Sequence, residues 1–358
     1  MASMGGLATG GLVAAGVVVF GLLAAGVYDR VTALSWAHTP FPWGRLIPAD
    51  GTRLYVRVEG QGTPVVVIEP ALGSPSAEWW HIQDELAKTT TVVTYDRAGY
   101  GWSRPGAFPR SSFRIVSELH SMLEHAGLRG PYVVVGHAQG GLYAQLFGRL
   151  HPDEVAGALF LDPVSPDNQR FKAELKPDAC LLSGIDKAAA LNSYSTLHRL
   201  GLIRPLRALF QRKLLFHQWR LSPTIREVIW QHHALSKAHK AMLSECEQNA
   251  TPANSSDVRA AGDFPHVPVR VLYHSPRRMV REMTMLNGLQ REDAEEVEDI
   301  WQQLVRAYLK LSPHGQWIVA PESGHYIHLD EPDLVVREVL GLVASVRQAR
   351  TEQSPPEA

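Results

Sequence analysis

The chain has 358 residues, of which 35 are basic and 36 acidic, so its formal net charge at pH 7 is −1. This length can bury a large core, either as one domain with an insertion or as two domains. The balanced charge, with neither a basic stripe nor an acidic tail, predicts no nucleic-acid partner. Cys180 and Cys246 are too few for a disulfide framework or a cysteine-based zinc site. We expect two ordinary thiols, although an oxidising compartment would allow them to pair.

An apolar run follows the short N-terminus (residues 1–6). Residues 7–27 carry no charge and are numerous enough to cross the hydrocarbon core of a membrane. We predict an uncleaved transmembrane anchor. The alternative is a cleaved signal peptide, but no basic residue precedes the run, and the run is longer than the apolar part of such a peptide. Arg30 and Arg45 follow the run, so the positive-inside rule favours a cytoplasmic location for the rest of the chain. Residues 28–45 are predicted to be a linker.

Strand and helix patterns alternate through residues 46–163. Apolar and polar residues alternate over residues 54–59, and short apolar runs occupy residues 65–68, 91–95, 132–135 and 155–161. These patterns predict strands. Helical periodicity separates them, most clearly over residues 113–126, and a further helix is expected to end near residue 150. Strands that alternate with helices at this spacing predict an α/β fold with a mostly parallel central sheet.

The alternation stops at Pro163 and resumes about a hundred residues later. Residues 164–263 show helical patterns and no convincing strand, so we predict a helical cap inserted into the sheet domain. Residues 264–346 then form the second half of the core, with strands over residues 267–273 and 316–320 and helices over residues 293–311 and 334–346. Residues 347–358 are predicted to be a flexible tail.

The segment from Val133 to Gly141 (VVVGHAQGG) predicts a sharp turn between a buried strand and a helix. In such a strand–turn–helix, small residues flank a tip that lies at the carboxyl edge of the sheet, beside the helix N-terminus. Gly136 and Gly140 meet this requirement. The tip, which presents a nucleophile in enzymes that use this turn, is Ala138, which has no nucleophilic group.

Together these segments resemble the α/β-hydrolase superfamily. The loop Tyr95–Ser103 (YDRAGYGWS) matches one branch of that superfamily, whose members carry G-H-S-x-G-G where this chain has Gly136–Gly141 (GHAQGG). The resemblance covers roughly residues 46–345 except the cap, and it places the family's serine at position 138. It therefore implies a nucleophile-to-alanine replacement, either engineered or natural.

The resemblance also implies an acid and a base. His325, in the segment Ser323–Asp330 after the last predicted strand, lies where the family's general base is expected. The usual position of the acid, the loop after residues 267–273, reads HSPRRM and holds no carboxylate. The alternative family position is the end of the preceding strand, where Asp162 stands. Asp162 could instead cap the turn into the cap region.

Two backbone N–H groups are expected to form an oxyanion hole. One belongs to Gln139, which follows the tip, and the other provisionally to Leu72, in the loop after residues 65–68. Relatives tend to have glycine where this chain has Ala71. If that glycine serves a positive φ, the alanine would strain or reshape the oxyanion hole. The paired histidines His232 and His233 lack a carboxylate at ligand spacing, and we predict no metal site and no cofactor.

These expectations favour a membrane-anchored hydrolase for ester, amide or lipid substrates, with Ala138, Asp162 and His325 at the three triad positions and little or no activity as written. The expected partners are a small-molecule or lipid ligand and the membrane. Two alternatives stay open. One is a non-catalytic ligand-binding or scaffold protein on the same fold. The other is a lyase or isomerase that uses His325 and Asp162 as an acid–base pair.

Overall fold

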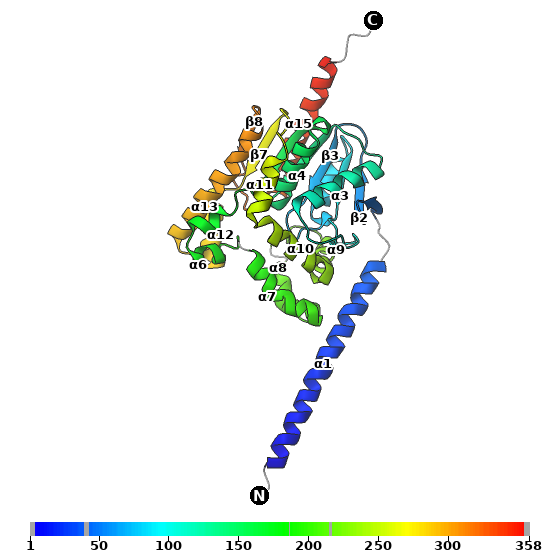
Figure 1. The fold of residues 1–358 in the computed structure, drawn as a ribbon, viewed down its shortest axis with the longest axis vertical. Helices are drawn as coiled ribbons and strands as arrows, with labels where there is room; N and C mark the ends of the chain where they lie inside the picture. Colours follow the sequence, from blue (N-terminus) through cyan, green and yellow to red (C-terminus); the bar gives the residue numbers. More distant parts are fainter. Residues whose placement is uncertain (1–3, 39–42, 186, 215–216, 354–358) are drawn as a thin grey trace.

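One mixed sheet forms the centre of the molecule (Figure 1). The computed structural model describes residues 4–38, 43–185, 187–214 and 217–353. Its eight strands lie in the order β1-β2-β4-β3-β5-β6-β7-β8. β2 pairs antiparallel with both its neighbours, and every other pairing is parallel. The strands are β1 (Arg45–Ala49), β2 (Thr52–Glu59), β3 (Val65–Glu69), β4 (Val92–Tyr95), β5 (Tyr132–His137), β6 (Val155–Leu161), β7 (Val269–Tyr273) and β8 (Gly315–Val319).

Helices cover both faces of the sheet because the central strands are apolar on both faces. Along β5, Val134 faces one core while Val133 and Val135 face the other, as the twofold alternation of a strand requires. The first core includes side chains of α3 (Ser112–His125) and α4 (Gln139–Leu150), and the second those of α2 (Trp80–Leu86) and α15 (Pro332–Gln353). The predicted α/β-hydrolase fold with a mostly parallel sheet is thus confirmed.

Helices also fill the segment between β6 and β7, as predicted for the cap, and the described residues there contain no strand. Their bounds are α5 (Arg170–Glu174), α6 (Pro177–Leu182), α7 (Lys187–Leu200), α8 (Arg207–Leu214), α9 (Pro223–Ala234), α10 (Ser236–Asn249) and α11 (Pro252–Ala260). After β7 come α12 (Pro276–Asn287), α13 (Arg291–Arg306) and, beyond β8, α14 (Ile327–Asp330). The structure adds β1 and α12, which the sequence patterns do not predict, and α15 runs through residues 347–353 of the expected flexible tail.

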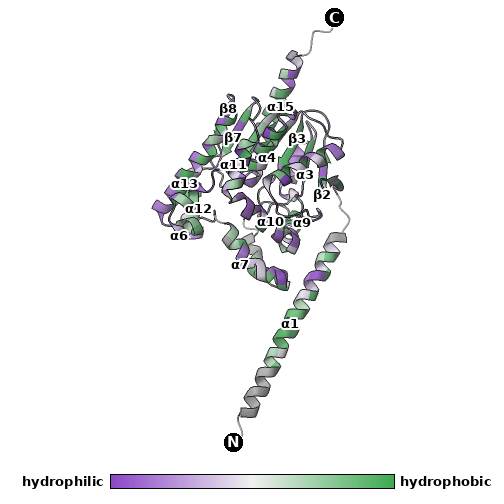
Figure 2. Ribbon diagram, in the orientation of Figure 1, coloured by the Kyte–Doolittle hydropathy of each residue, from purple (hydrophilic) through white to green (hydrophobic). Residues whose placement is uncertain are grey.

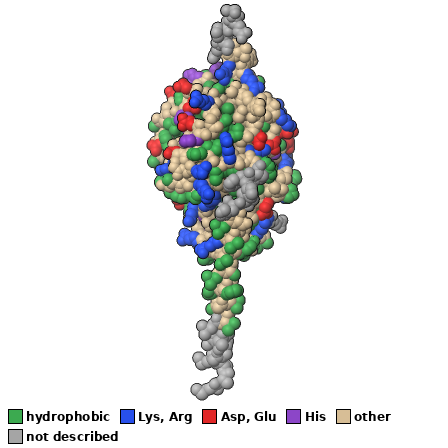
Figure 3. All heavy atoms as spheres, turned by 90° about the vertical axis from the view of Figure 1, so that its right-hand side faces the viewer, with side chains coloured by type: hydrophobic (Ala, Val, Ile, Leu, Met, Phe, Trp, Pro, Cys, Tyr) green, Lys and Arg blue, Asp and Glu red, His purple; other side chains and the backbone are tan. Residues whose placement is uncertain are grey.

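The N-terminal helix α1 (Met4–His38) projects from the body (Figure 1) and is apolar over most of its described length (Figure 2). Val13–Trp36 is long and apolar enough to cross a membrane, a test that a signal sequence also passes. Figure 3 shows the apolar rod emerging below a body that carries the charged side chains. The helix is longer than the predicted anchor and includes residues 28–38, which were expected to be linker. The contacts that hold this end include an ion pair between Asp29 and Arg204 of the cap and the stacking of Trp36 on Trp102, at 4.6 Å between ring centroids.

The turn between β5 and α4 has the predicted sharp geometry. Ala138 adopts φ 50° and ψ −117°, a strained conformation for a residue other than glycine. Close backbone approach explains both flanking glycines. A Cβ on Gly136 would lie 2.6 Å from the carbonyl oxygen of Gly140, and one on Gly140 would lie 2.1 Å from that of Glu69. The absence of these side chains lets the N-terminus of α4 pack directly against the end of β3.

We expect Gly140→Ala to destabilise the protein by about 2–3 kcal/mol, because the new methyl group would overlap rigid backbone and force a shift. This loss would occur even though alanine favours helices by about 1 kcal/mol over glycine. Gly157→Ala in β6 is the control, since its Cβ would meet its nearest neighbour at 3.6 Å, an ordinary contact. Denaturant unfolding of both variants decides the matter, and equal unfolding free energies would contradict this account of the turn.

Candidate active site

Ala138 lies at the carboxyl edge of the sheet, at the wall of a cavity of about 330 Å³. His325, Gln139 and Leu72 line the same cavity, although three different parts of the chain supply them. The structure therefore brings together four of the five residues predicted for the site around one cavity. The fifth, Asp162, is fully buried directly behind His325.

His325 and Asp162 form a short hydrogen bond. His325 Nδ1 lies 2.6 Å from Asp162 Oδ2. Because a carboxylate only accepts hydrogen bonds, Nδ1 carries the proton and Nε2 is left as the basic nitrogen. Burial lowers the pKa of His325, and the hydrogen bond from its ring to Asp162 opposes this effect only in part. The imidazole is therefore neutral at neutral pH and able to accept a proton.

Asp162 accepts three hydrogen bonds from side chains. Besides His325, Trp301 Nε1 donates to Oδ1 at 2.9 Å, and His274 Nδ1 donates to Oδ2 at 2.8 Å. Burial alone would raise the pKa of Asp162, but His274 and His325 hold it below its usual range. The residue also has a positive φ of 43°, so the backbone at the end of β6 is strained where it presents this carboxylate.

His274 links two buried carboxylates, a role that the sequence patterns do not predict. Its Nε2 lies 2.8 Å from Glu298 Oε2, while its Nδ1 faces Asp162. Both ring nitrogens must donate, so the ring is a protonated imidazolium. Burial alone would lower the pKa of His274, but Asp162 and Glu298 raise it to about 10. Tyr273 donates its hydroxyl to the other oxygen of Glu298 at 2.5 Å, which completes a fully buried chain.

His274 occupies the loop after β7, the usual family position of the acid. A histidine in this loop, together with an aspartate at the end of β6, is the sequence feature from which this arrangement could have been predicted. Glu298 and Trp301 lie three residues apart on α13, so they share one helix face. Nothing in the sequence indicates that this face packs against β6, and their partnership with Asp162 becomes visible only in the structure.

Leu72 and Gln139 are the residues expected to supply the N–H groups of an oxyanion hole. In the described part of the chain, neither donates a backbone hydrogen bond outside the regular helices and strands, and both residues line the cavity. Ala71 has no positive φ, so the alanine at this family glycine position brings no backbone strain. Instead, buried Arg97 holds the loop, donating to the carbonyl oxygens of Pro70 at 2.8 Å and Ala71 at 2.9 Å.

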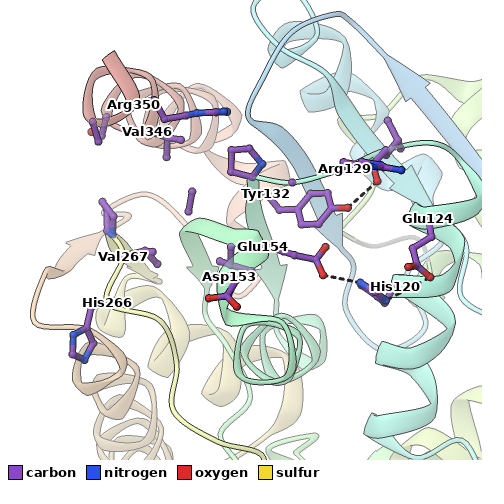
Figure 4. A pocket seen from close by; sticks show the side chains of 18 residues that line it. His120, Glu124, Arg129, Tyr132, Asp153, Glu154, His266, Val267, Val346 and Arg350 are labelled. Carbon is purple, nitrogen blue, oxygen red and sulfur yellow. Dashed lines mark hydrogen bonds and ion pairs between the residues drawn. The ribbon is translucent and has the colours of Figure 1, made fainter. Parts of the chain in front are cut away.

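A separate cavity, of about 810 Å³, lies far from this site, at the opposite, amino edge of the sheet (Figure 4). Near it, His120, His151 and Glu154 place potential metal-ligating atoms within 4.8 Å of one another. The two imidazole rings stack in parallel, however, with centroids 3.8 Å apart and an interplanar angle of 7°. One ion cannot lie in both ring planes without unstacking them, and His120 already pairs with Glu154 at 2.9 Å. We assign no metal to this group.

The buried His274 predicts a specific pH dependence of stability. Its pKa in the folded protein, about 10, exceeds the ordinary value of about 6.5. Its stabilisation is therefore complete below pH 6.5 and is lost as the pH rises toward 10. We expect His274→Asn to lower the free energy of unfolding at pH 6 by about 3–5 kcal/mol, because it leaves two carboxylates without their cation.

The difference between the parent chain and His274→Asn should shrink between pH 7 and 10, as measured by denaturant unfolding. His266→Asn, at an exposed site, is the control and should show no such trend. Parallel stability curves for the parent and His274→Asn would exclude a protonated His274.

Comparison with known proteins shows the same architecture. A model of the alpha/beta hydrolase family matches residues 65–338. An AB hydrolase superfamily protein of Gibberella zeae is 25% identical over 303 residues, which are 79% of this chain and 87% of that protein. A thermophilic esterase from Thermogutta terrifontis has a TM-score of 0.57 and 18% identity over 85% of this chain and 98% of that one. An epoxide hydrolase, CorEH, has a TM-score of 0.59 and 17% identity over 85% and 99%. This chain belongs to the alpha/beta hydrolase family.

Proposed function

We propose that this protein is a membrane-anchored hydrolase-type protein for carboxylic ester, amide or lipid substrates, inactive or nearly so because Ala138 stands at the nucleophile position. The observation that carries the proposal is the 2.6 Å hydrogen bond between His325 and Asp162 at the wall of the cavity that Ala138 also lines. Base, acid and tip residue belong to three separate segments, so the arrangement is specific to the folded chain.

Each group would have a defined role if position 138 carried a hydroxyl. Nε2 of His325 would remove the proton of that hydroxyl as it attacks a carbonyl carbon, and would later return the proton to the leaving group. Asp162 would hold the ring in the required tautomer and stabilise its protonated form. The N–H groups of Leu72 and Gln139 would stabilise the negative charge that develops on the carbonyl oxygen.

The alanine removes the attacking oxygen and leaves the remaining groups in place. In a serine protease, losing the nucleophile alone costs about a millionfold in kcat. A methyl group in place of a hydroxymethyl group does not obstruct the cavity, so the proposal includes retained ligand binding.

The anchor part of the proposal rests on α1, with its apolar stretch Val13–Trp36 and its contacts to the cap. The basic residues Arg30 and Arg45, which follow the apolar run, favour a cytoplasmic body. The thermophilic esterase and the epoxide hydrolase that share the fold support a small organic substrate, and the anchor favours one that partitions into membranes.

An acid–base reaction without a covalent intermediate is the second candidate function. The complete His325–Asp162 pair favours it, because this pair needs no oxygen at position 138 to move a proton. Turnover of a substrate by the parent chain that disappears in His325→Ala would support this candidate over the first.

Ala138→Ser should restore the nucleophile. We expect this variant to react with a fluorophosphonate probe and to hydrolyse p-nitrophenyl esters at least about a thousandfold faster than the parent chain, because only the attacking oxygen is missing. Intact-mass analysis and absorbance assays provide the measurements. The double variant Ala138→Ser/His325→Ala is the control and should lose both reactions. An unlabelled, inactive Ala138→Ser protein that is folded would refute the hydrolase proposal.

The pH profile of Ala138→Ser tests the electrostatics of the site. Because burial lowers the pKa of His325, the acid limb of kcat/KM should fall below the ordinary histidine pKa of about 6.5. His274→Asn in the same background removes a neighbouring positive charge, so the limb should move to higher pH. A limb that stays in place would show that His274 has no influence on the base.

A further inference from the structure

Two cavities meet beside the candidate active site. The first is the 330 Å³ cavity lined by Ala138 and His325. The second, of about 220 Å³, lies under the cap, and its lining includes Leu191, Ile203 and Met242. Leu72 and Lys187 line both cavities and so mark the junction between them. A ligand that filled both cavities would pass these two side chains.

The second cavity is suited to a hydrocarbon chain. Tyr194 and Phe210, whose rings meet edge to face at 5.6 Å, add aromatic surface to its aliphatic walls. A cavity of about 150 Å³ with similar Leu, Ile and Phe walls stays dry and binds benzene in another protein. The cavity under the cap is larger than that. His198, His233 and His239 also line it, but most of its exposed wall is apolar, so an apolar occupant is favoured.

Lys187 brings a positive charge to the junction. It is the first residue of α7, and its ammonium group has no hydrogen-bond or ion-pair partner among the residues that the structure describes. By contrast, Glu282, which lines the first cavity, already pairs with Arg278 at 2.7 Å. Burial lowers the pKa of Lys187, because a desolvated ammonium group is destabilised unless an anion compensates it.

The second cavity also lies next to α1. Ile203, in its wall, sits between two residues that meet this helix: Arg204 pairs with Asp29, and a Cβ on Gly201 would lie 3.0 Å from Cα of Gly26. The apolar cavity is thus beside the segment proposed to enter the membrane, where single-chain amphiphiles concentrate.

We propose that the junction binds a single-chain amphiphile with an anionic end group, its hydrocarbon chain in the cavity under the cap and its carboxylate on Lys187. Such a ligand is an acyl chain of the kind that hydrolysis of a lipid ester would release. The inference rests on the proposed function only in treating this cavity as the binding site, and binding needs no nucleophile.

The test measures binding to the full-length parent chain reconstituted in nanodiscs, with empty nanodiscs as the blank. The probes are radiolabelled decanoate, its neutral counterpart 1-decanol, and octanoate. We expect decanoate to bind more tightly than octanoate by roughly tenfold or more, since each buried methylene contributes about 0.8 kcal/mol, or about fourfold. Lys187→Met should weaken decanoate binding at least about tenfold and change 1-decanol binding less than about twofold.

Two further variants keep the result interpretable. Lys240→Met removes an exposed cap charge on α10 and should leave all three probes unaffected. Ala190→Trp fills the cavity under the cap and should weaken decanoate and 1-decanol together. Equal binding of decanoate to the parent and Lys187→Met, or of decanoate and 1-decanol to the parent, would overturn the proposal and show that Lys187 only lines the wall with its hydrocarbon stem. An unreactive Ala138→Ser protein would leave these measurements unchanged, so the two proposals fail separately.

Discussion

The candidate site depends on the interactions of one group, the carboxylate of Asp162. It is fully buried and accepts hydrogen bonds from His325, His274 and Trp301, which come from three segments beyond the cap. An isolated buried carboxylate would be very unfavourable, so the protonated His274 is what allows Asp162 to stay charged. Burial is the main cause that lowers the pKa of His325 and keeps the base neutral, and the nearby imidazolium of His274 adds to this effect. Position and protonation state are therefore set by one buried ionic chain.

A second constraint fixes the other side of the cavity. At the strained turn, Gly140 touches the end of β3, and the neighbouring Gln139 lines the same cavity as Leu72 of the loop after β3. Arg97 holds this loop by its carbonyl groups and also pairs with Glu245 of the cap helix α10 at 3.1 Å. Arg97 consequently joins the loop after β3 to the cap helix α10, so a movement of α10 would disturb this loop.

The sequence predicts the parts of this protein that local patterns determine. The apolar strands, the glycine-flanked turn at Ala138 and the positions of Asp162 and His325 follow from short-range periodicity together with the chain order of a known fold. β1 is missed because a five-residue edge strand with a proline gives a weak signal. α12 is missed although its apolar residues Met279, Val280, Met283 and Leu286 recur at helical spacing. His274 and Lys187 are missed for a different reason. The roles of both residues depend on tertiary contacts. No local pattern predicts that His274 lies between two carboxylates or that Lys187 lies where two cavities meet.

The retained groups also limit what the alanine can mean chemically. Stability alone does not require the buried ionic network of Asp162, His274 and Glu298, since replacing such groups with apolar residues often leaves the free energy of unfolding unchanged or raises it. Here the ionic network is complete and the cavity is open, and Ala138 lacks only the oxygen that a nucleophile at the tip of the turn would carry. Under the proposed function, such a site would orient a polar group at the N–H groups of Leu72 and Gln139 and hold an apolar chain beside them. Because Lys187 lines both cavities, the proposed ligand site would discriminate ligands by their charge and not through the reactivity of residue 138.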